Sequence, residues 1–214
     1  MDNLMTSGPA DASTTVVLGH GAGAPMDSPF MEFFAGGIAA AGLSCVRFEF
    51  PYMAERRETG KKRPPNTMAV LLETWQGVID HVHQRNSDAT VIIGGKSMGG
   101  RVASMLASES KMDGLVCLGY PFHPAGRPEK LRVDHLLTIP TPTLIIQGTR
   151  DTLGNVDDVA GYTLSETIQL HWLEDGDHNF KPRKASGRTE EQNWQEGVDA
   201  LGSFAQDCRQ GVST

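Results

Sequence analysis

The segment Gly95-Lys96-Ser97-Met98-Gly99 places a serine between two glycines, directly after a buried strand-like run and directly before a helix-like stretch. A turn of this form holds the serine in a strained backbone conformation with its hydroxyl exposed above a sheet. Glycine is needed two residues before and after it, because side chains there would collide with neighbouring backbone. A serine hydroxyl is a poor nucleophile at neutral pH and requires an adjacent base. The pattern predicts a nucleophile at Ser97, provided that the chain supplies that base.

Asp151 and His178 supply an acid and a base in the order that such chemistry requires. Asp151 follows the strand-like run Thr143-Gln147, and His178 follows the run Thr167-Leu173. Parallel strands share their carboxyl ends, so both side chains are expected at the same sheet edge as Ser97. His178 would take the hydroxyl proton, and the carboxylate of Asp151 would fix the histidine tautomer and stabilise its charged form. The sequence predicts a Ser97–His178–Asp151 triad.

Other acids and histidines compete for these roles. Four acids are interpreted as structural, at the start of a helix or in turns: Asp157, Asp158, Asp175 and Asp177. Three histidines lie on a strand or on a polar helical stretch and are interpreted as inert: His171, His81 and His83. His123 follows the fourth strand-like run and remains a minor alternative base.

Attack of a serine on a carbonyl also requires donors for the oxyanion that forms. The backbone N–H of Met98, at a helix N-terminus, is the expected first donor. The second is expected from the glycine-rich loop at residues 19–25, where we choose Ala22 and place Gly23 next. The alternative is a merely tight glycine turn. His20 is expected to organise this loop by hydrogen bonding.

The rest of the chain predicts the scaffold for these residues. Six strand-like runs are apolar: Thr14-Leu18, Ser44-Phe50, Thr90-Gly94, Gly114-Gly119, Thr143-Gln147 and Thr167-Leu173. Five stretches are helix-like: Pro29-Ala41, Thr67-Gln84, Met98-Ser108, Val156-Tyr162 and Thr189-Asp207. This alternation is typical of a three-layer α/β fold with a mostly parallel sheet. We predict one domain over residues 1–214 with a six-stranded sheet and loose tails at 1–12 and 209–214.

Composition excludes several classes. The formal net charge of −7 argues against general affinity for nucleic acid or for an anionic membrane. No apolar run reaches the roughly 18 to 20 residues of a membrane-spanning helix, and residues 1–13 show no secretory signal. The three cysteines cannot all pair, which indicates a reduced, cytoplasmic protein. The serine chemistry needs no metal or organic cofactor, and no metal-ligand spacing is present, so none is expected. The oligomeric state stays open.

The gaps between the elements bear on the substrate. The interval from Tyr120 to Pro142 has room for little more than a short helix, so no large lid is expected and the pocket should be shallow or open. Five residues follow strand ends and are candidate pocket walls: Tyr52, Met53, Tyr120, Pro121 and Phe122. The charged segment 55–65 is expected to be an irregular loop. Its arginines, Arg56 and Arg57 above all, would bind a substrate anion, or the segment is a solvated, mobile loop.

Four motifs together resemble the α/β-hydrolase superfamily: His20-Gly21-Ala22-Gly23, Gly95-Lys96-Ser97-Met98-Gly99-Gly100, Gly148-Thr149-Arg150-Asp151 and Gly176-Asp177-His178. The segment Phe48-Glu49-Phe50-Pro51-Tyr52-Met53 is similar to a small group of cap-less bacterial hydrolases, to testis-expressed hydrolase-like proteins and to a chromatin-complex subunit. The group is distantly similar to dienelactone hydrolases. The resemblance implies a serine-hydrolase fold and fixes no substrate. The usual two leading antiparallel strands are expected to be absent.

The sequence therefore predicts a serine hydrolase that acts on a small carboxylic ester, thioester or related acyl substrate through an acyl-enzyme at Ser97. The alternative is a non-catalytic binding or scaffold protein that keeps the fold. A dinucleotide-binding fold is disfavoured, because the first loop lacks a full G-x-G-x-x-G before its helix.

Overall fold

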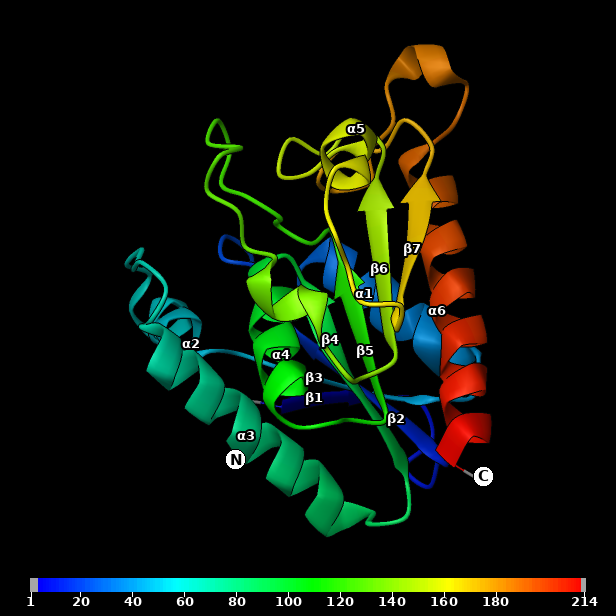
Figure 1. Ribbon diagram of the computed structural model, residues 1–214. Coiled ribbons are helices and arrows are strands. Elements are labelled where there is room, and N and C mark those ends of the chain that lie inside the picture. Colours follow the sequence, from blue (N-terminus) through cyan, green and yellow to red (C-terminus); the bar gives the residue numbers. More distant parts are fainter. Residues whose placement is uncertain (1–3, 213–214) are drawn as a thin grey trace.

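A seven-stranded sheet forms the centre of the molecule in the computed structural model, which describes residues 4–212 (Figure 1). Six strands run parallel: β2 (Thr14–Gly19), β3 (Ser44–Phe48), β4 (Thr90–Lys96), β5 (Gly114–Leu118), β6 (Thr143–Gly148) and β7 (Ile168–Leu173). The strand order is β1-β3-β2-β4-β5-β6-β7, with β1 (Leu4–Ser7) antiparallel to β3 at one edge. Strands β2 to β6 are buried along their whole length, as their continuously apolar sequences predict.

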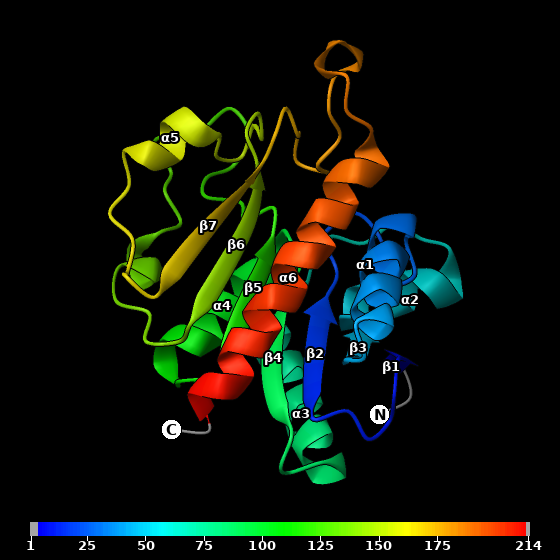
Figure 2. The ribbon, with the colours of Figure 1, turned by 90° about the vertical axis from the view of Figure 1, so that its right-hand side faces the viewer.

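Helices cover both faces of this sheet and complete three layers. The helices α1 (Pro29–Ala40) and α6 (Glu190–Val212) lie over the face turned to the viewer in Figure 2, and the other face carries α3 (Met68–Arg85) and α4 (Met98–Glu109). The short helices α2 (Pro51–Thr59) and α5 (Val156–Ala160) follow strand regions near the carboxyl edge. Two buried apolar clusters fill the spaces between the layers. The predicted three-layer α/β fold is confirmed.

The amphipathic helix α3 shows how the sequence directs this packing. Its apolar residues recur every three or four positions, and Leu71, Trp75, Val78, Ile79 and Val82 are buried against the sheet. Burial of each such side chain contributes roughly 1.5–3 kcal/mol. This face of α3 therefore packs into the core of the protein.

The strand count and the tails need correction. Residues 4–7 were expected in a loose tail, yet they pair with β3 from Leu4 opposite Phe48 to Ser7 opposite Cys45, so the sheet has seven strands and not six. One leading antiparallel strand is thus present. The C-terminal tail prediction is also wrong for residues 209–212, because α6 continues to Val212. The remaining tail residues 1–3 and 213–214 lie outside the described part of the chain.

The charged segment that follows β3 is also more regular than expected. Helix α2 begins with Pro51 at its first position and ends at Thr59. Gly60 follows it in a left-handed conformation (φ 69°), which closes the last turn. The expectation of an irregular loop is therefore wrong for residues 55–59. Both signals, a proline at the start and a glycine past the end, are visible in the sequence.

Within the described residues 4–212, no large lid covers the carboxyl edge of the sheet. Between β5 and β6 the chain forms only a short 3₁₀ helix, Asp134–Leu137, as the short interval predicts. Among the described residues, no helix has both the length and the apolar character needed to cross a membrane.

Candidate active site

Ser97 lies in a sharp turn between β4 and α4 and has the backbone angles φ 50° and ψ −110°. Such angles are strained for a residue with a side chain. The end of β2 crosses directly against this turn: a Cβ added to Gly95 would lie 2.0 Å from the carbonyl oxygen of Gly19, and one on Gly99 would lie 2.2 Å from the same atom. Both contacts are impossible, so both positions must be glycine.

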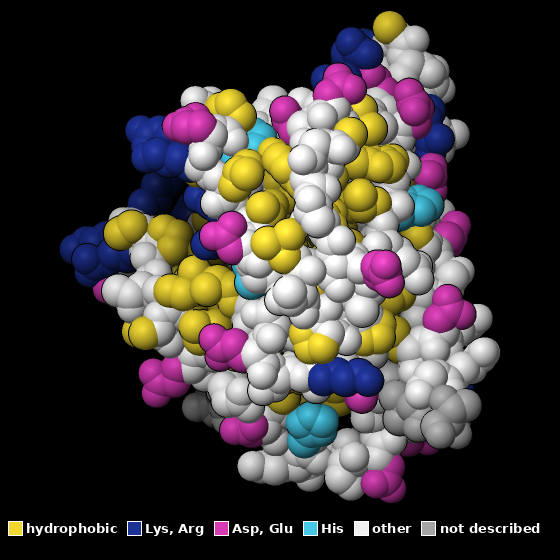
Figure 3. All heavy atoms as spheres, viewed as in Figure 1, with side chains coloured by type: hydrophobic (Ala, Val, Ile, Leu, Met, Phe, Trp, Pro, Cys, Tyr) yellow, Lys and Arg dark blue, Asp and Glu magenta, His cyan; other side chains and the backbone are white. Residues whose placement is uncertain are grey.

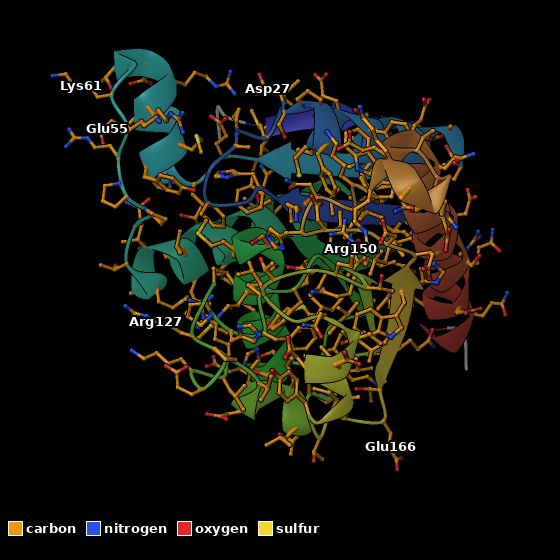
Figure 4. The ribbon with its side chains drawn as sticks, turned by 90° about the horizontal axis from the view of Figure 1, so that it is seen from above. Asp27, Glu55, Lys61, Arg127, Arg150 and Glu166 are labelled. Carbon is orange, nitrogen blue, oxygen red and sulfur yellow. The ribbon has the colours of Figure 1, made fainter. Side chains whose placement is uncertain are left out.

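The carboxyl ends of β4, β6 and β7 bring Ser97, Asp151 and His178 into one hydrogen-bonded chain. His178 Nε2 lies 3.0 Å from Ser97 Oγ, and its Nδ1 lies 2.7 Å from Asp151 Oδ2. Figure 4 looks down on this edge of the sheet, where Arg150, the residue before Asp151, is labelled. Asp151 is fully buried, whereas the side chain of His178 is 25% exposed. The structure therefore joins the three residues that the sequence predicted.

Hydrogen bonds from neighbouring residues fix the orientation of the Asp151 carboxylate. Its Oδ1 accepts a hydrogen bond from the backbone N–H of Leu153 at 2.8 Å, and its Oδ2 accepts one from Gln147 Nε2 at 2.9 Å. Gln147 is itself buried and also bonds the backbone N–H and carbonyl of Tyr120. With His178, three donors converge on Asp151, which suits an ionised carboxylate. Sequence reasoning missed Gln147, because a glutamine at the end of an apolar strand carries no motif.

Lys96 connects the serine turn to the histidine loop. Its buried ammonium donates a hydrogen bond to the backbone carbonyl of His178 and lies 5.3 Å and 5.5 Å from the ring centroids of Phe30 and Phe180. Burial lowers the pKa of Lys96 to about 8, although the charge of Asp151 opposes this shift. Lys96, the residue directly before Ser97, thus connects the serine turn to the loop that carries His178.

Each competing acid has a structural partner. Asp175 pairs with Arg183 and Arg150, and the hydrogen bond from Arg183 lowers the pKa of its carboxyl to about 2. Asp177 accepts backbone N–H bonds within its own turn. Asp157 and Asp158 lie in the first turn of α5, where Asn155 and Asp158 form a capping box.

The competing histidines are also engaged elsewhere. His123 contacts Asp158 at 3.4 Å and the carbonyl of Pro124 at 3.0 Å, and His171 contacts Glu196 at 3.2 Å. None of these contacts includes Ser97.

His20 and Tyr52 hold the glycine-rich loop after β2. His20 is fully buried, with Nδ1 donating to the carbonyl of Gly21 at 2.7 Å and Nε2 accepting from the N–H of Phe50 at 3.1 Å. Burial lowers the pKa of His20, which suits this neutral, bridging role. The Tyr52 hydroxyl donates to the carbonyl of Ala22 at 3.0 Å.

These contacts determine the direction of the loop N–H groups. In a trans peptide the carbonyl and the following N–H point in opposite directions. The carbonyls of Gly21 and Ala22 face His20 and Tyr52, so the N–H groups of Ala22 and Gly23 are turned away from that side.

Helix α2 is fastened over this loop by its arginines. Arg57 donates to both carboxylate oxygens of the buried Glu49, at 3.1 Å and 2.6 Å, and to both of Asp27, at 3.0 Å and 2.8 Å. Arg56 donates to the carbonyl of Gly23 at 3.2 Å. The two arginines that the sequence suggested for anion binding thus have partners within the chain.

Two hollows meet at Ser97. One, of about 310 Å³, is lined by Gly21, Ala22, Gly23, Ala24, Ser28, Phe30, Met31, Lys96, Ser97, His178 and Asn179. The other, of about 340 Å³, is lined by Ala22, Pro65, Asn66, Met68, Leu71, Ser97, Met98, Arg101, Pro121, Arg132 and Leu153. We call them the histidine cavity and the arginine cavity. Of the suggested walls, Pro121 lines the arginine cavity. The other four line neither cavity and are buried: Tyr52, Met53, Tyr120 and Phe122.

The fold and the geometry around Ser97 define the class of α/β hydrolases. The chain matches the family described as "Alpha/beta hydrolase domain" over residues 12–206 and belongs to that family.

Solved structures share the fold at low sequence identity. A dienelactone hydrolase from Anabaena variabilis has a TM-score of 0.71 at 20% identity, over 95% of this chain and 90% of that chain. A serine hydrolase without a lid from Xanthomonas campestris gives 0.67 at 18% identity, over 98% and 88%. The esterase domain of a Rhodothermus marinus protein gives 0.65 at 14%, over 94% and 91%. The resemblance to dienelactone hydrolases and the lidless α/β-hydrolase fold are thereby confirmed.

Proposed function

We propose that this chain is a serine hydrolase that cleaves a carboxylic ester, thioester or related acyl substrate. The observation that carries the proposal is the continuous hydrogen-bonded chain from Ser97 through His178 to the buried Asp151. His178 takes the proton of Ser97 as the hydroxyl attacks the acyl carbon, and Asp151 stabilises the imidazolium that results. His178 then protonates the leaving group. Water attacks the acyl-enzyme in the second half of the cycle, with His178 again as base.

The oxyanion is held by the backbone N–H of Met98, the first residue of α4, and by that of Ala22, with Gly23 as the next donor. Two observations support this role. Ala22 lines both cavities together with Ser97, and a Cβ on the preceding Gly21 would lie 3.8 Å from the Cβ of Ser97. The N–H groups of Ala22 and Gly23 are turned away from Tyr52 and His20, which supports their role as donors.

Labelling with a fluorophosphonate tests the proposal. We expect one adduct by intact mass, mapped to Ser97 by peptide analysis, and no adduct on Ser97→Ala. Ser104 is an internal comparison, because its hydroxyl also lies beside a histidine, 2.8 Å from His135 Nε2, yet it is buried. An unlabelled but folded wild-type protein would contradict the proposal and support a role in binding alone.

Tyr52→Phe tests how the glycine-rich loop is held. The hydroxyl that orients the Ala22 carbonyl is lost while the ring stays, so the loop donors are loosened but not removed. Loss of a whole oxyanion donor costs about 10²–10³ in rate, so we expect a fall of about tenfold in kcat, with KM unchanged. Steady-state kinetics with a short-chain 4-nitrophenyl ester measures both.

Tyr162→Phe is the matched control, because Tyr162 is only partly buried and lies away from the loop, with its ring 5.7 Å from that of Phe122. An unchanged kcat for Tyr52→Phe, or a loss explained by a lower melting temperature, would contradict the positioning role.

A further inference from the structure

The arginine cavity contains two guanidinium groups without a carboxylate partner. Arg101 lies on α4, four residues after Ser97, and Arg132 lies in the segment between β5 and the 3₁₀ helix. Within residues 4–212, neither guanidinium forms an ion pair or a side-chain hydrogen bond, and Arg101 Nε is buried without any hydrogen-bond partner. By contrast, Arg57, Arg63, Arg183 and Arg188 each bind a carboxylate.

The two groups also repel each other. Burial, and then the charge of Arg101, lower the pKa of Arg132 below its ordinary value. The same two causes lower the pKa of His135, whose Nε2 is bonded to Ser104 beneath the cavity. A partly buried pair of like charges is costly unless an opposite charge joins it. The site is therefore incomplete within the described chain, and an anion of suitable size would complete it.

The position of His178 indicates whether the anionic group belongs to the acyl chain or to the leaving group of the substrate. His178 lines the histidine cavity and not the arginine cavity. Because His178 must protonate the leaving group, the leaving group occupies the histidine cavity and the acyl chain extends into the arginine cavity. Apart from Ser97, Asn66 and the two arginines, the residues that line this cavity are apolar and include Met68, Leu71, Pro121 and Leu153. These walls suit a short hydrocarbon chain that ends in an anionic group.

Positive charge on the outer surface also favours the approach of anionic substrates. Figure 3 shows Lys and Arg side chains gathered along the left edge, over the segment after α2 and over the loop that follows β5. Figure 4 shows Lys61 and Arg127, one from each of these segments, at the same side of the molecule. In a chain with a net charge of −7, this local concentration of positive charge would draw anionic substrates to the opening.

We propose that Arg101 and Arg132 form a carboxylate subsite for the acyl chain, so that the preferred substrates are monoesters or monothioesters of short dicarboxylic acids. The guanidinium forks bind the distal carboxylate while Ser97 attacks the ester carbonyl. This inference rests on the proposed hydrolase function of Ser97.

The test compares monoethyl adipate with ethyl adipamate, in which a neutral carboxamide replaces the carboxylate, by the rate of ethanol release. We expect kcat/KM to be at least about tenfold higher for the monoester. Arg101→Gln and Arg132→Gln should each lower kcat/KM for the monoester by about 10- to 100-fold and leave ethyl adipamate nearly unchanged. Monoesters of glutarate and pimelate measure the best chain length.

Arg85→Gln is the matched control, since it removes a positive charge from the last turn of α3, which lines neither the histidine cavity nor the arginine cavity. Arg101→Lys, which keeps the charge and loses the fork, should fall between wild type and Arg101→Gln. Equal kcat/KM values for the two esters, or equal losses for both in the glutamine variants, would overturn the subsite.

A binding measurement tests the carboxylate subsite independently of catalysis. Calorimetric titration of Ser97→Ala with monoethyl adipate should show binding that is lost in Ser97→Ala/Arg101→Gln. Binding without turnover or fluorophosphonate labelling in the wild type would keep the subsite and refute the hydrolase function. Labelling with no preference for the monoester, and no binding to Ser97→Ala, would refute the subsite alone.

Discussion

Asp151→Asn is expected to lower kcat about 10³- to 10⁴-fold while the protein stays folded. Both carboxylate oxygens of Asp151 accept hydrogen bonds: Oδ1 from Leu153, and Oδ2 from Gln147 and His178. An asparagine side chain must turn its NH₂ group either toward Leu153 or toward Gln147 and His178. In both orientations two hydrogen-bond donors face each other. If the NH₂ group faces His178, the imidazole adopts the tautomer that cannot accept the Ser97 proton. In either orientation the negative charge that stabilises the imidazolium is lost.

The measurement is kcat for a short-chain ester, together with the rate of fluorophosphonate labelling and the melting temperature. Asp158→Asn is the matched control, because Asp158 lies on the same sheet edge, at the start of α5, and contacts His123 and not His178. Its kcat should stay within about twofold of wild type. A loss of less than tenfold in Asp151→Asn would show that another group orients His178.

Gly95→Ala is expected to remove a large part of the stability of the fold. Gly95 has φ +146°, which L side chains rarely adopt, and the new methyl would lie 2.0 Å from the carbonyl oxygen of Gly19. The strain and the forced displacement of β2 together cost roughly 3–5 kcal/mol, against a typical domain stability of about 5–15 kcal/mol. Urea unfolding followed by circular dichroism measures this loss, and a variant that cannot accumulate in folded form is the extreme of the same result.

Gly36→Ala, the same glycine-to-alanine change at an open position, is expected to increase the stability of the protein. Gly36 lies on the exposed side of α1, and a Cβ there would meet nothing within 4 Å. Alanine loses less conformational entropy than glycine in a helix, so this variant should gain about 0.5–1 kcal/mol. If Gly95→Ala unfolds within 1 kcal/mol of wild type, the close approach of β2 to the serine turn is not the constraint that we describe.

Ser97, Asp151 and His178 could be named from the sequence because each follows a predicted strand. The strands before Ser97 and Asp151 are buried along their whole length, whereas β7, before His178, is a partly exposed edge strand. Strands that alternate with helices run parallel, so their carboxyl ends meet at one edge whatever the loops do. The four-residue strand β1 escaped prediction, because so short an edge strand needs no apolar alternation and depends on the backbone of β3.

The supporting residues could not be predicted, because their partners are distant in sequence. Arg101 and Arg132 meet only because the segment after β5 returns over the start of α4. Arg57 looked free within a run of charges, yet Glu49 and Asp27 reach it from two other segments. These side chains acquire their roles from tertiary contacts that no local sequence pattern encodes.

Strand β1 has a further consequence, for the behaviour of the protein in solution. Without it, the outer side of β3 would present a row of unpaired N–H and carbonyl groups, which is a template for pairing between separate molecules. Strand β1 pairs with this row and leaves only a four-residue strand at the edge of the sheet, and so short an edge strand is a poorer template for other molecules. A shortened chain that begins after Ser7 would expose this edge, so tags and truncations are better placed at the other end of the chain.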